Sequence, residues 1–333
     1  MKKALVFGSS GFIGRHLVGR LKAEGYWVRG VDLADPPPDA READDYVVGD
    51  LRQPDVVANA IERGMDELYQ LAADMGGAGY IFTGDNDANV LRNSALVNLH
   101  AAECAGQKEV KRLFYSSSAC VYPKHNQQDP DAPQCGEHTT YPADPDSEYG
   151  WEKLFAERLY LAYRRNRHLD VRIARLHNVY GPGNPWEGGR EKAPAALCRK
   201  IAEAEDGGVV EIWGDGSQTR SFLYIDDCLD GIRALMRSAT PGPVNIGSEE
   251  MIPIDEFARL VMRTAGKHLT FRHVPGPVGV RGRRSDNRLM HAATGWLPKV
   301  SLEEGIARTY RWVATQVEAR RRQVGVVSSL GCP

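Results

Sequence analysis

A glycine-rich loop, GSSGFIG at residues 8–14, constrains the fold of this chain more than any other segment. The apolar run ALVF precedes the loop, and an amphipathic segment at 15–25 follows it. In a strand–turn–helix unit, Gly8 would permit the tight turn and Gly11 would let the backbone approach a pyrophosphate. Gly14 would allow close packing of the helix on the strand. Amide groups at the helix start bind phosphate oxygens. The loop therefore predicts a dinucleotide site; the alternative is a purely structural turn.

Strand–helix alternation continues through the first half of the chain. The predicted strands are residues 4–8, 27–32, 46–50, 67–73, 112–118 and 171–181. Helical patterns such as 15–25 and 96–106 lie between them. This alternation predicts an α/β fold with a doubly wound, parallel, Rossmann-type sheet, which binds ligands beyond the carboxyl ends of its strands.

After residue 181 the chain becomes more irregular, which predicts a smaller α/β lobe for the substrate. Its predicted elements are helices at 195–205, 254–266 and 301–322 and a short strand within 209–216. We expect the Rossmann domain to comprise residues 1–177 plus about 221–247, and the lobe 178–220 plus about 248–322. Residues 323–333 show no helical pattern and are expected to form a tail.

Composition excludes several classes of protein. The net charge of −2 gives no general affinity for nucleic acid or an anionic membrane. No stretch approaches the roughly 18–20 apolar residues of a membrane span. The six cysteines form no CxxC pair or zinc spacing, so we expect no metal site and reduced thiols in a cytoplasmic protein.

A carboxylate at the end of the second predicted strand favours one cofactor. Asp32 lies about twenty residues beyond the glycine loop, where it would bind the ribose hydroxyls of NAD. The same charge would repel the 2′-phosphate of NADP. Asp50 ends the third predicted strand and is expected to face the adenine.

The segment YGWEK places Tyr149 and Lys153 four residues apart, on one face of a helix. An ammonium beside a phenol favours the phenolate, so we expect the pKa of Tyr149 to fall below its usual value near ~10. Such a tyrosine takes a proton from a sugar hydroxyl while hydride passes to NAD. The alternative is an ordinary solvated pair.

The glycine loop, the serines at 116–118 and the YxxxK pair together resemble the extended short-chain dehydrogenase/reductase family, over nearly the whole chain. The resemblance implies that Ser118 shares the substrate hydrogen bond with Tyr149, and that Lys153 supports the cofactor and the tyrosine. The rest of the expected cofactor site comprises Phe12, Ile13, Leu51, Leu71, Ala72 and Ala73.

Cys120 lies two residues beyond Ser118 and, on a continued strand, would face the same pocket. Family members that eliminate water from a sugar typically carry an acidic pair here, whereas this chain has Ala119 and Cys120. A thiol with a pKa near ~8.5 is a few per cent thiolate at neutral pH and suits removal of a carbon-bound proton next to a ketone. The alternative is a small buried thiol that only packs.

Lys192 precedes an alanine-rich helix that has Pro194 in its first turn. An ammonium at the positive end of a helix dipole is disfavoured, so its pKa should fall and let the group exchange protons near neutrality. The alternative is a solvated lysine.

Several loops fit a sugar nucleotide. Gly76 and Gly77 would let a sugar approach the backbone, unless they only form a flexible turn, and Asn178 lies near another strand end. Gln218 and Arg220 are expected at the junction of the two parts. An arginine cluster, Arg281, Arg283 and Arg284, is the candidate for the substrate pyrophosphate, and its alternative is a solvated basic loop.

Within the family, eight stretches resemble, in the same order, the NAD-dependent epimerases that act on GDP-mannose at carbons 3 and 5. They are LAADMGGAGY, SSACVYP, YGWEKL, RLHNVYGP, GGREKAPAALCRK, WGDGSQTRSF, VNIGSEEM and PGPVGVRGRRSDN. The resemblance implies that Cys120 and Lys192 are the two proton carriers. It implies a substrate site of Gly76, Gly77, Ser118, Ala119, Cys120, Asn178, Glu191, Lys192, Ala193, Lys200, Gln218, Thr219, Arg220 and Arg283. It also implies a homodimer, to which the helices around 92–105 and 149–165 are expected to contribute.

Three other functions remain open at this point. A GDP-4-keto-6-deoxymannose epimerase/reductase also has a cysteine after its serines but consumes NADPH, against which Asp32 argues. A simple UDP-sugar 4-epimerase needs no proton carrier at Cys120. A regulator that only binds a nucleotide sugar would have no use for Ser118, Tyr149, Lys153, Cys120 and Lys192 together.

Overall fold

The computed structural model of the chain describes residues 1–37 and 42–330, with side chains described as far as Gln323. Its centre is a seven-stranded sheet in the order β11-β6-β5-β4-β1-β2-β3, and every neighbouring pair is parallel. The strands are β1 Lys3–Phe7, β2 Trp27–Asp32, β3 Asp45–Val48, β4 Glu67–Gln70, β5 Leu113–Ser118, β6 Val171–Leu176 and β11 Val244–Ile246. The doubly wound Rossmann-type fold predicted from sequence is confirmed.

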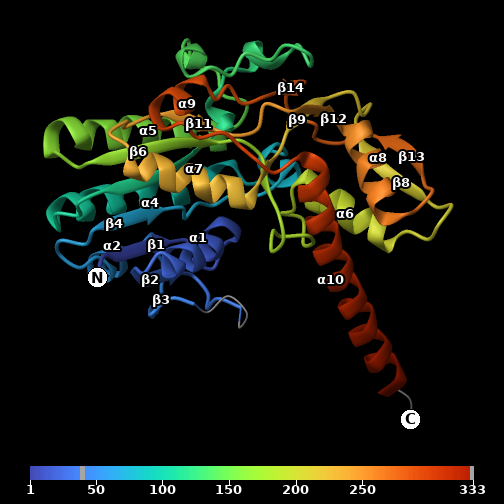
Figure 1. Ribbon diagram of the computed structural model, residues 1–333, viewed down its shortest axis with the longest axis horizontal. Helices are drawn as coiled ribbons and strands as arrows, with labels where there is room; N and C mark the ends of the chain where they lie inside the picture. The colour runs from blue at the N-terminus through green and yellow to red at the C-terminus, as the bar shows by residue number, and fades with distance from the viewer. Residues whose placement is uncertain (38–41, 331–333) are drawn as a thin grey trace.

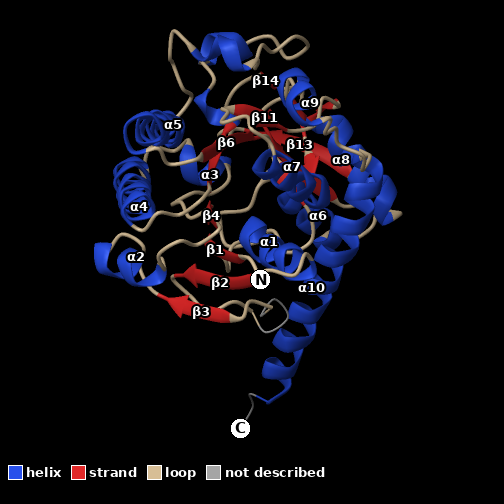
Figure 2. Ribbon diagram, turned by 60° about the vertical axis from the view of Figure 1, so that its left-hand side comes forward, coloured by secondary structure: helices blue, strands red, loops and turns tan. Residues whose placement is uncertain are grey.

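Helices cover both faces of this sheet (Figures 1 and 2). One apolar cluster joins it to α2 (Pro54–Ala60), α4 (Asp87–Gln107) and α5 (Glu148–Arg167). A second cluster joins it to α1 (Phe12–Ala23) and α7 (Ile225–Arg237) and continues into the smaller lobe. Because this second cluster is continuous, the lobe is packed directly against the sheet layers.

The smaller lobe is built from short sheets and helices. Its sheets are β7 (Val179–Tyr180) with β10 (Leu223–Tyr224), β8 (Val209–Trp213) with β13 (Thr270–Val274), and β9 (Thr219–Ser221) between β12 (Met251–Pro253) and β14 (Gly282–Arg283). Helices α6 (Ala193–Glu203), α8 (Ile254–Ala265) and α10 (Leu302–Leu330) pack on one another. Short segments α3 (Ala78–Ile81), α9 (Arg288–Thr294) and the 3₁₀ turns η2 (Ala119–Val121), η3 (Lys124–Gln127) and η4 (Glu137–Thr140) complete the chain.

Several boundary predictions were wrong. The strands expected over 46–50 and 67–73 end at Val48 and Gln70. The strand expected over 171–181 is divided into β6 and β7, because Asn178 has a φ of 39°, outside the extended region. Helix α10 continues to Leu330 and projects from the body in Figure 1, so most of the expected non-helical tail is helical. No helix among the described residues is long and apolar enough to cross a membrane.

Candidate active site

The glycine loop between β1 and α1 is a turn that only glycine fits. Gly8 has a φ of 80°, and a Cβ there would lie 2.9 Å from the amide nitrogen of Ala72. A Cβ on Gly14 would lie 1.9 Å from the carbonyl oxygen of Gly8. The loop therefore leaves a backbone-lined cradle at the start of α1, whose N-cap is Gly11, and this geometry fits a dinucleotide pyrophosphate.

The other expected cofactor residues follow the same edge of the sheet. Phe12 and Ile13 begin α1, and the remaining apolar residues follow β3 and β4: Leu51, Leu71, Ala72 and Ala73. Asp32, at the end of β2, accepts hydrogen bonds from the amides of Ser10 (2.9 Å) and Leu33 (2.7 Å). A carboxylate held beside the loop in this way fits the ribose hydroxyls.

The carboxylate of Asp50 is already bound by the side chain of Arg52. It accepts three hydrogen bonds from the Arg52 guanidinium, the shortest at 2.7 Å. The hydrogen bonds from Arg52 hold the pKa of Asp50 below its usual value. The contact of Asp50 with adenine therefore stays a prediction.

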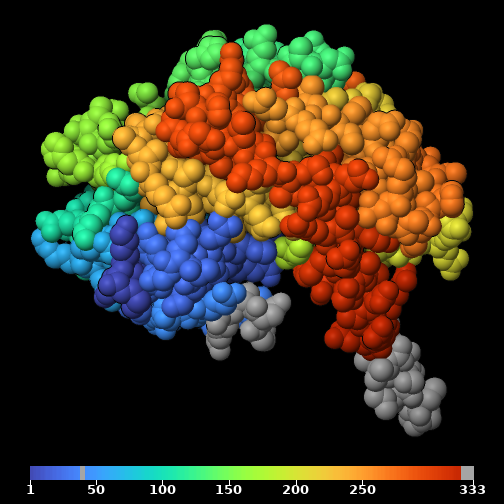
Figure 3. Space-filling model, in the orientation of Figure 1, coloured from blue at the N-terminus to red at the C-terminus, as the bar shows by residue number. Residues whose placement is uncertain are grey.

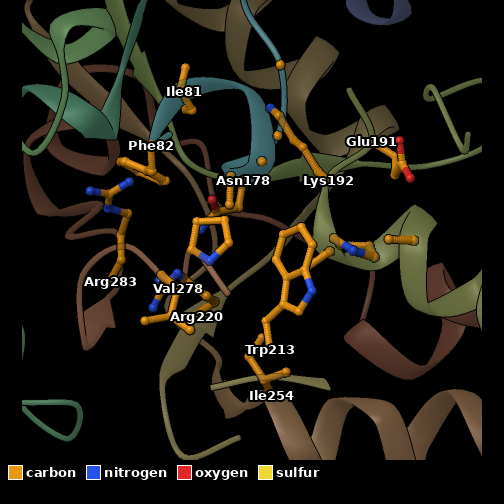
Figure 4. Close-up of a pocket in the computed structure, with 18 of the residues that line it drawn as sticks. Ile81, Phe82, Asn178, Glu191, Lys192, Trp213, Arg220, Ile254, Val278 and Arg283 are labelled. Carbon is orange, nitrogen blue, oxygen red and sulfur yellow. The ribbon is translucent and has the colours of Figure 1, made fainter. Parts of the chain in front are cut away.

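One cavity of about 380 Å³ lies between the sheet edge and the lobe, with Lys192, Trp213, Arg220 and Arg283 around it (Figure 4). It is lined by nearly all of the predicted substrate residues: Gly76, Gly77, Ser118, Ala119, Cys120, Asn178, Glu191, Lys192, Ala193, Lys200, Gln218, Arg220 and Arg283. Tyr149 lines it as well. Thr219 does not line the cavity. Its hydroxyl donates instead to the carbonyl oxygen of Pro130.

Cys120 reaches this cavity by a different route from the one expected. Strand β5 ends at Ser118, and Cys120 lies in the 3₁₀ turn η2 rather than on a continued strand. The Ser118 hydroxyl caps the turn by accepting from the Cys120 amide at 3.2 Å. Helix α5 packs tightly on the turn because a Cβ on Gly150 would lie 2.2 Å from the Cys120 carbonyl oxygen.

Tyr149 and Lys153 are both buried on one face of α5, and the Lys153 ammonium lies 5.5 Å from the Tyr149 ring centroid. The Lys153 Nζ donates to the carbonyl oxygen of Ser116 at 2.8 Å. The expected fall in the pKa of Tyr149 is not found in the protein alone. Burial raises that pKa, negative charge on Cys120 adds to the rise, and the hydrogen bond with Ser118 opposes it.

Lys192 occupies the N-cap position of α6, with Pro194 directly inside the helix. The pKa of its amine is lowered, as expected from the sequence, but the main cause is burial rather than the helix dipole. Negative charge on Cys120 opposes this lowering. The arrangement places a readily deprotonated amine and a thiol in one cavity.

The arginine cluster does not converge on a pyrophosphate. Arg281 is partly exposed and pairs with Asp215, and Arg284 is exposed. Arg283 is buried, and its guanidinium donates to Gln127, Cys120 and Asp146. The three side chains therefore do not share one ligand, because Arg281 is taken up by Asp215, Arg283 by Asp146, and Arg284 faces solvent.

Arg220 is better placed to meet a diphosphate. It lines the cavity and donates only to the backbone carbonyls of Thr219 and Val278, both at 2.8 Å. Within the described residues, no carboxylate lies at ion-pair distance from it. Gln218 beside it donates to the Trp213 carbonyl, while its buried Oε1 has no partner in the described part of the chain.

The glycines before α3 line the cavity and also lie against neighbouring parts of the chain, and their contact with a sugar stays a prediction. A Cβ on Gly77 would lie 2.1 Å from the carbonyl oxygen of Glu191, and one on Gly76 would lie 2.6 Å from the Cβ of Tyr80. The Gly77 amide also donates to the Arg190 carbonyl at 3.0 Å. Gly77 therefore lets the loop that carries Lys192 close over the cavity.

Glu191 and Asn178 line the cavity with their polar groups already engaged. Glu191 accepts from Arg199 at 3.1 Å and from the Gly189 amide at 2.7 Å. The Asn178 amide donates to the Ser221 carbonyl at 2.9 Å. Lys200 donates to the Glu211 carbonyl at 2.8 Å and lies 5.8 Å from the Trp213 ring centroid.

Asp146, Trp213 and Phe82 are among the residues of the cavity wall that sequence reasoning missed. Trp213 ends β8 and is the first residue of the WGDGSQTRSF stretch, and a tryptophan that ends a strand at the lobe junction was a usable signal. Asp146 lies in a proline-rich connection, where no periodicity places a side chain. Phe82 follows the four-residue helix α3 and gave no signal.

The chain matches the sequence profile described as "NAD dependent epimerase/dehydratase family" over residues 4–247. It is 40% identical to a GDP-mannose 3,5-epimerase of Arabidopsis thaliana over 333 residues, which covers 99% of this chain and 86% of that protein. It is 31% identical to a GDP-L-fucose synthase of Sinorhizobium fredii over 274 residues, with coverage of 80% and 84%.

A solved structure shares the fold at full length. The crystal structure of the UDP-glucuronic acid 4-epimerase from Bacillus cereus, in complex with UDP-glucuronic acid and NAD, is 26% identical, with a TM-score of 0.77. The match covers 94% of this chain and 99% of that one.

Proposed function

The chain belongs to the NAD dependent epimerase/dehydratase family, and we propose from its cavity that it is an isomerase of GDP-mannose. It oxidises GDP-D-mannose at C4, inverts C5, C3 or both, and reduces C4 again, which yields GDP-L-galactose, GDP-L-gulose or both. The observation that carries this proposal is that Cys120 and Lys192 line the same cavity as Ser118 and Tyr149. A simple 4-epimerase has no use for the first two residues.

NAD, when bound in the glycine cradle, would supply a hydride acceptor and a positive charge. Tyr149 takes the proton of the C4 hydroxyl, and Ser118 holds that hydroxyl by a shared hydrogen bond. Lys153 stabilises the phenolate form of Tyr149 that accepts this proton, a form that the buried site otherwise disfavours. Tyr149 returns the proton when C4 is reduced.

The 4-ketone makes the hydrogens at C3 and C5 acidic. One of Cys120 and Lys192 removes such a hydrogen, and the other delivers a proton to the opposite face of the carbon, which inverts it. Burial raises the pKa of the thiol and lowers the pKa of the amine, so the two values approach each other. Shifts toward each other favour proton exchange through the substrate in both directions.

Arg220 binds the diphosphate of the substrate in this proposal. Its guanidinium faces the cavity without an acidic partner among the described residues, and the open Gln218 Oε1 lies beside it. Trp213, which is 41% exposed, offers an aromatic surface to the guanine base. The anionic ligand is thus held locally, in a chain with almost no net charge.

We also propose that the protein is a homodimer in the cytoplasm. Exposed apolar side chains lie together on α4, α5 and the segment before α5: Leu99, Tyr141, Trp151 and Phe155. A two-fold contact through this surface would bury them. The described cysteines are all free thiols, which fits a reducing compartment.

The test is to incubate purified protein with GDP-mannose and to identify the hexoses by NMR. The proposal predicts GDP-L-galactose or GDP-L-gulose without net use of added NADH or NADPH. Net consumption of NADPH with a 4-keto-6-deoxy sugar, and no conversion of GDP-mannose, would instead establish the epimerase/reductase alternative.

A further inference from the structure

A buried ion pair, which the proposed reaction does not itself use, lies beside the sulfur of Cys120. The side chains of Arg283 and Asp146 are 6% and 4% exposed, and Arg283 Nη2 lies 2.5 Å from Asp146 Oδ2. Burying two charges is costly unless their remaining hydrogen-bonding groups are also satisfied. Such a pair on the wall of a reaction cavity is therefore a candidate for a functional role.

The guanidinium of Arg283 is fixed in orientation by three contacts. Its Nη2 meets Asp146, its Nε donates to Gln127 Oε1 at 2.7 Å, and its Nη1 faces the Cys120 sulfur at 3.3 Å. A planar guanidinium held at two edges has no freedom at the third. The nitrogen that faces the sulfur is therefore placed by the other two contacts.

Asp146 connects this arginine to the helix of the catalytic tyrosine. Its Oδ1 accepts from the Ser147 hydroxyl at 3.1 Å, and Ser147 caps the start of α5 by accepting from the Gly150 amide at 3.3 Å. Arg283 comes from β14 in the smaller lobe. Asp146 thus links the start of α5 to β14 of the smaller lobe, next to Cys120.

We propose that Asp146 is a positioning residue: its carboxylate anchors Arg283 beside Cys120 and so sets the protonation state in which this sulfur meets the sugar. The inference rests on the proposed function, in which Cys120 exchanges a proton with a ring carbon. When the thiolate acts as base, the carbon–hydrogen bond breaks, a sulfur–hydrogen bond forms, and the electron pair moves into the enolate of the 4-ketone. An N–H of protonated Lys192 then breaks as a new carbon–hydrogen bond forms on the other face.

The charges around the sulfur oppose one another. Burial raises the pKa of Cys120, the Asp146 carboxylate raises it further, and Arg283 and the hydrogen bond with Ser118 lower it. The other titratable and charged groups that act at this part of the cavity are Tyr149 and Lys153 of α5, Lys192 at the start of α6, and Arg220 of β9. Removal of the Asp146 charge should therefore lower the pKa of Cys120, and removal of the Arg283 charge should raise it.

The experiment measures the rate at which iodoacetamide alkylates Cys120 as a function of pH, by mass spectrometry of the Cys120 peptide from the full-length protein as purified. Asp146→Asn keeps an amide oxygen that can still accept from Arg283 but loses the negative charge, so we expect the midpoint of the rate profile to fall by about one pH unit, the lower range for a neighbouring charge. For Arg283→Gln we expect it to rise by a similar amount. Asp144→Asn, in the same connection but 49% exposed and only loosely paired with Lys124, should leave it unchanged.

Two results would overturn the proposal. If the pair only holds the structure together, either change admits water to the site, and both midpoints move in the same direction. An unchanged or raised midpoint in Asp146→Asn alone would also contradict it, so the test stands even if Arg283→Gln does not fold. Arg283→Lys, which retains a charge, then serves as the second variant and should shift the midpoint less.

The assay contains no sugar nucleotide, so its outcome is independent of the proposed substrate. Failure to convert GDP-mannose would overturn the proposed function while these midpoints still moved apart. Conversely, midpoints that do not move apart would refute the role of Asp146 in an active epimerase.

Discussion

Cys120 and Lys192 are ordinary side chains whose surroundings shift their pKa values in opposite directions. Burial acts on a thiol and on an amine in opposite senses, because it disfavours the thiolate and the ammonium alike. The same burial raises the pKa of Tyr149, so the phenolate needs the positive charges of Lys153 and of a bound cofactor. At the scale of the residue, the proposed chemistry depends on the removal of water more than on any unusual group.

Replacement of Cys120 by alanine is expected to lower epimerisation by about 10²–10⁴-fold, the usual contribution of a positioned acid or base. Tyr149 and Lys153 remain, so oxidation and reduction at C4 should persist. Product formation by NMR and hydride transfer by cofactor absorbance measure the two parts. Cys104→Ala is the matched control, since this half-buried thiol lies on α4 and does not line the cavity. A Cys120→Ala enzyme with full epimerase activity would remove the residue from the mechanism.

At the scale of the element, the loop that carries Lys192 is held by a contact between backbones. Gly77→Ala would place a methyl group on the Glu191 carbonyl and displace this loop. We expect kcat/KM to fall by roughly 10²-fold, as for a 1 Å misplacement of a catalytic group, with a smaller effect on unfolding. Gly106→Ala, inside helix α4, is the control, because the new Cβ would contact only the Tyr163 side chain of α5, at 3.8 Å. It should keep full activity and gain about 0.5–1 kcal/mol in the free energy of unfolding. Equal activity of the two variants would contradict the account.

The end of β6 gives the fold a defined response to acid. Burial lowers the pKa of His177 to about 3, and the hydrogen bond with Asn245 opposes this only in part. Between pH 6.5 and 3 the unfolded chain binds a proton that the folded chain does not, so stability falls as the pH falls below 6.5. This one group contributes about 1.4 kcal/mol per pH unit. Urea unfolding at pH 7, 6 and 5 measures the slope, and His177→Gln should reduce it by that amount. An unchanged slope would show that the ring binds its proton equally in the folded and unfolded chains.

Local patterns predicted some elements and missed others for identifiable reasons. Strands β1 to β6 and helices α6 and α8 follow from apolar periodicity and the glycine loop, which act over a few residues. The 3₁₀ turn at Cys120 depends on a cap from Ser118 and on contact with Gly150, thirty positions away in the printed sequence. The role of Gly77 depends on Glu191, and the position of Arg283 on Asp146 and Gln127. Most of the predicted substrate residues line the cavity, but the partners that orient them belong to distant segments.

At the scale of the whole molecule, the sheet layers and the lobe enclose a cavity between them, and apolar side chains of α4 and α5 remain exposed. Helix α10 extends away from the sheet layers (Figure 3). Trp151 and Phe155 lie one turn apart on α5 and are 42% and 46% exposed. Trp151→Glu with Phe155→Glu is expected to convert a dimer into a monomer, because the charges would be buried at the contact. Sedimentation equilibrium gives the mass. Leu297→Glu, at a 47% exposed leucine outside these helices, should not change it. A wild-type monomer, or a dimer that survives the double change, would place the interface elsewhere or exclude it.

The central claim is that a transient ketone at C4 allows protons to leave and return at the carbons beside it. The most direct test is turnover of GDP-mannose in heavy water, followed by NMR of each ring position. The account predicts deuterium at C5, at C3 or at both, and none at C4, because the hydride taken from C4 is the one returned. Deuterium at C4, or inverted product without deuterium at C3 and C5, would contradict it.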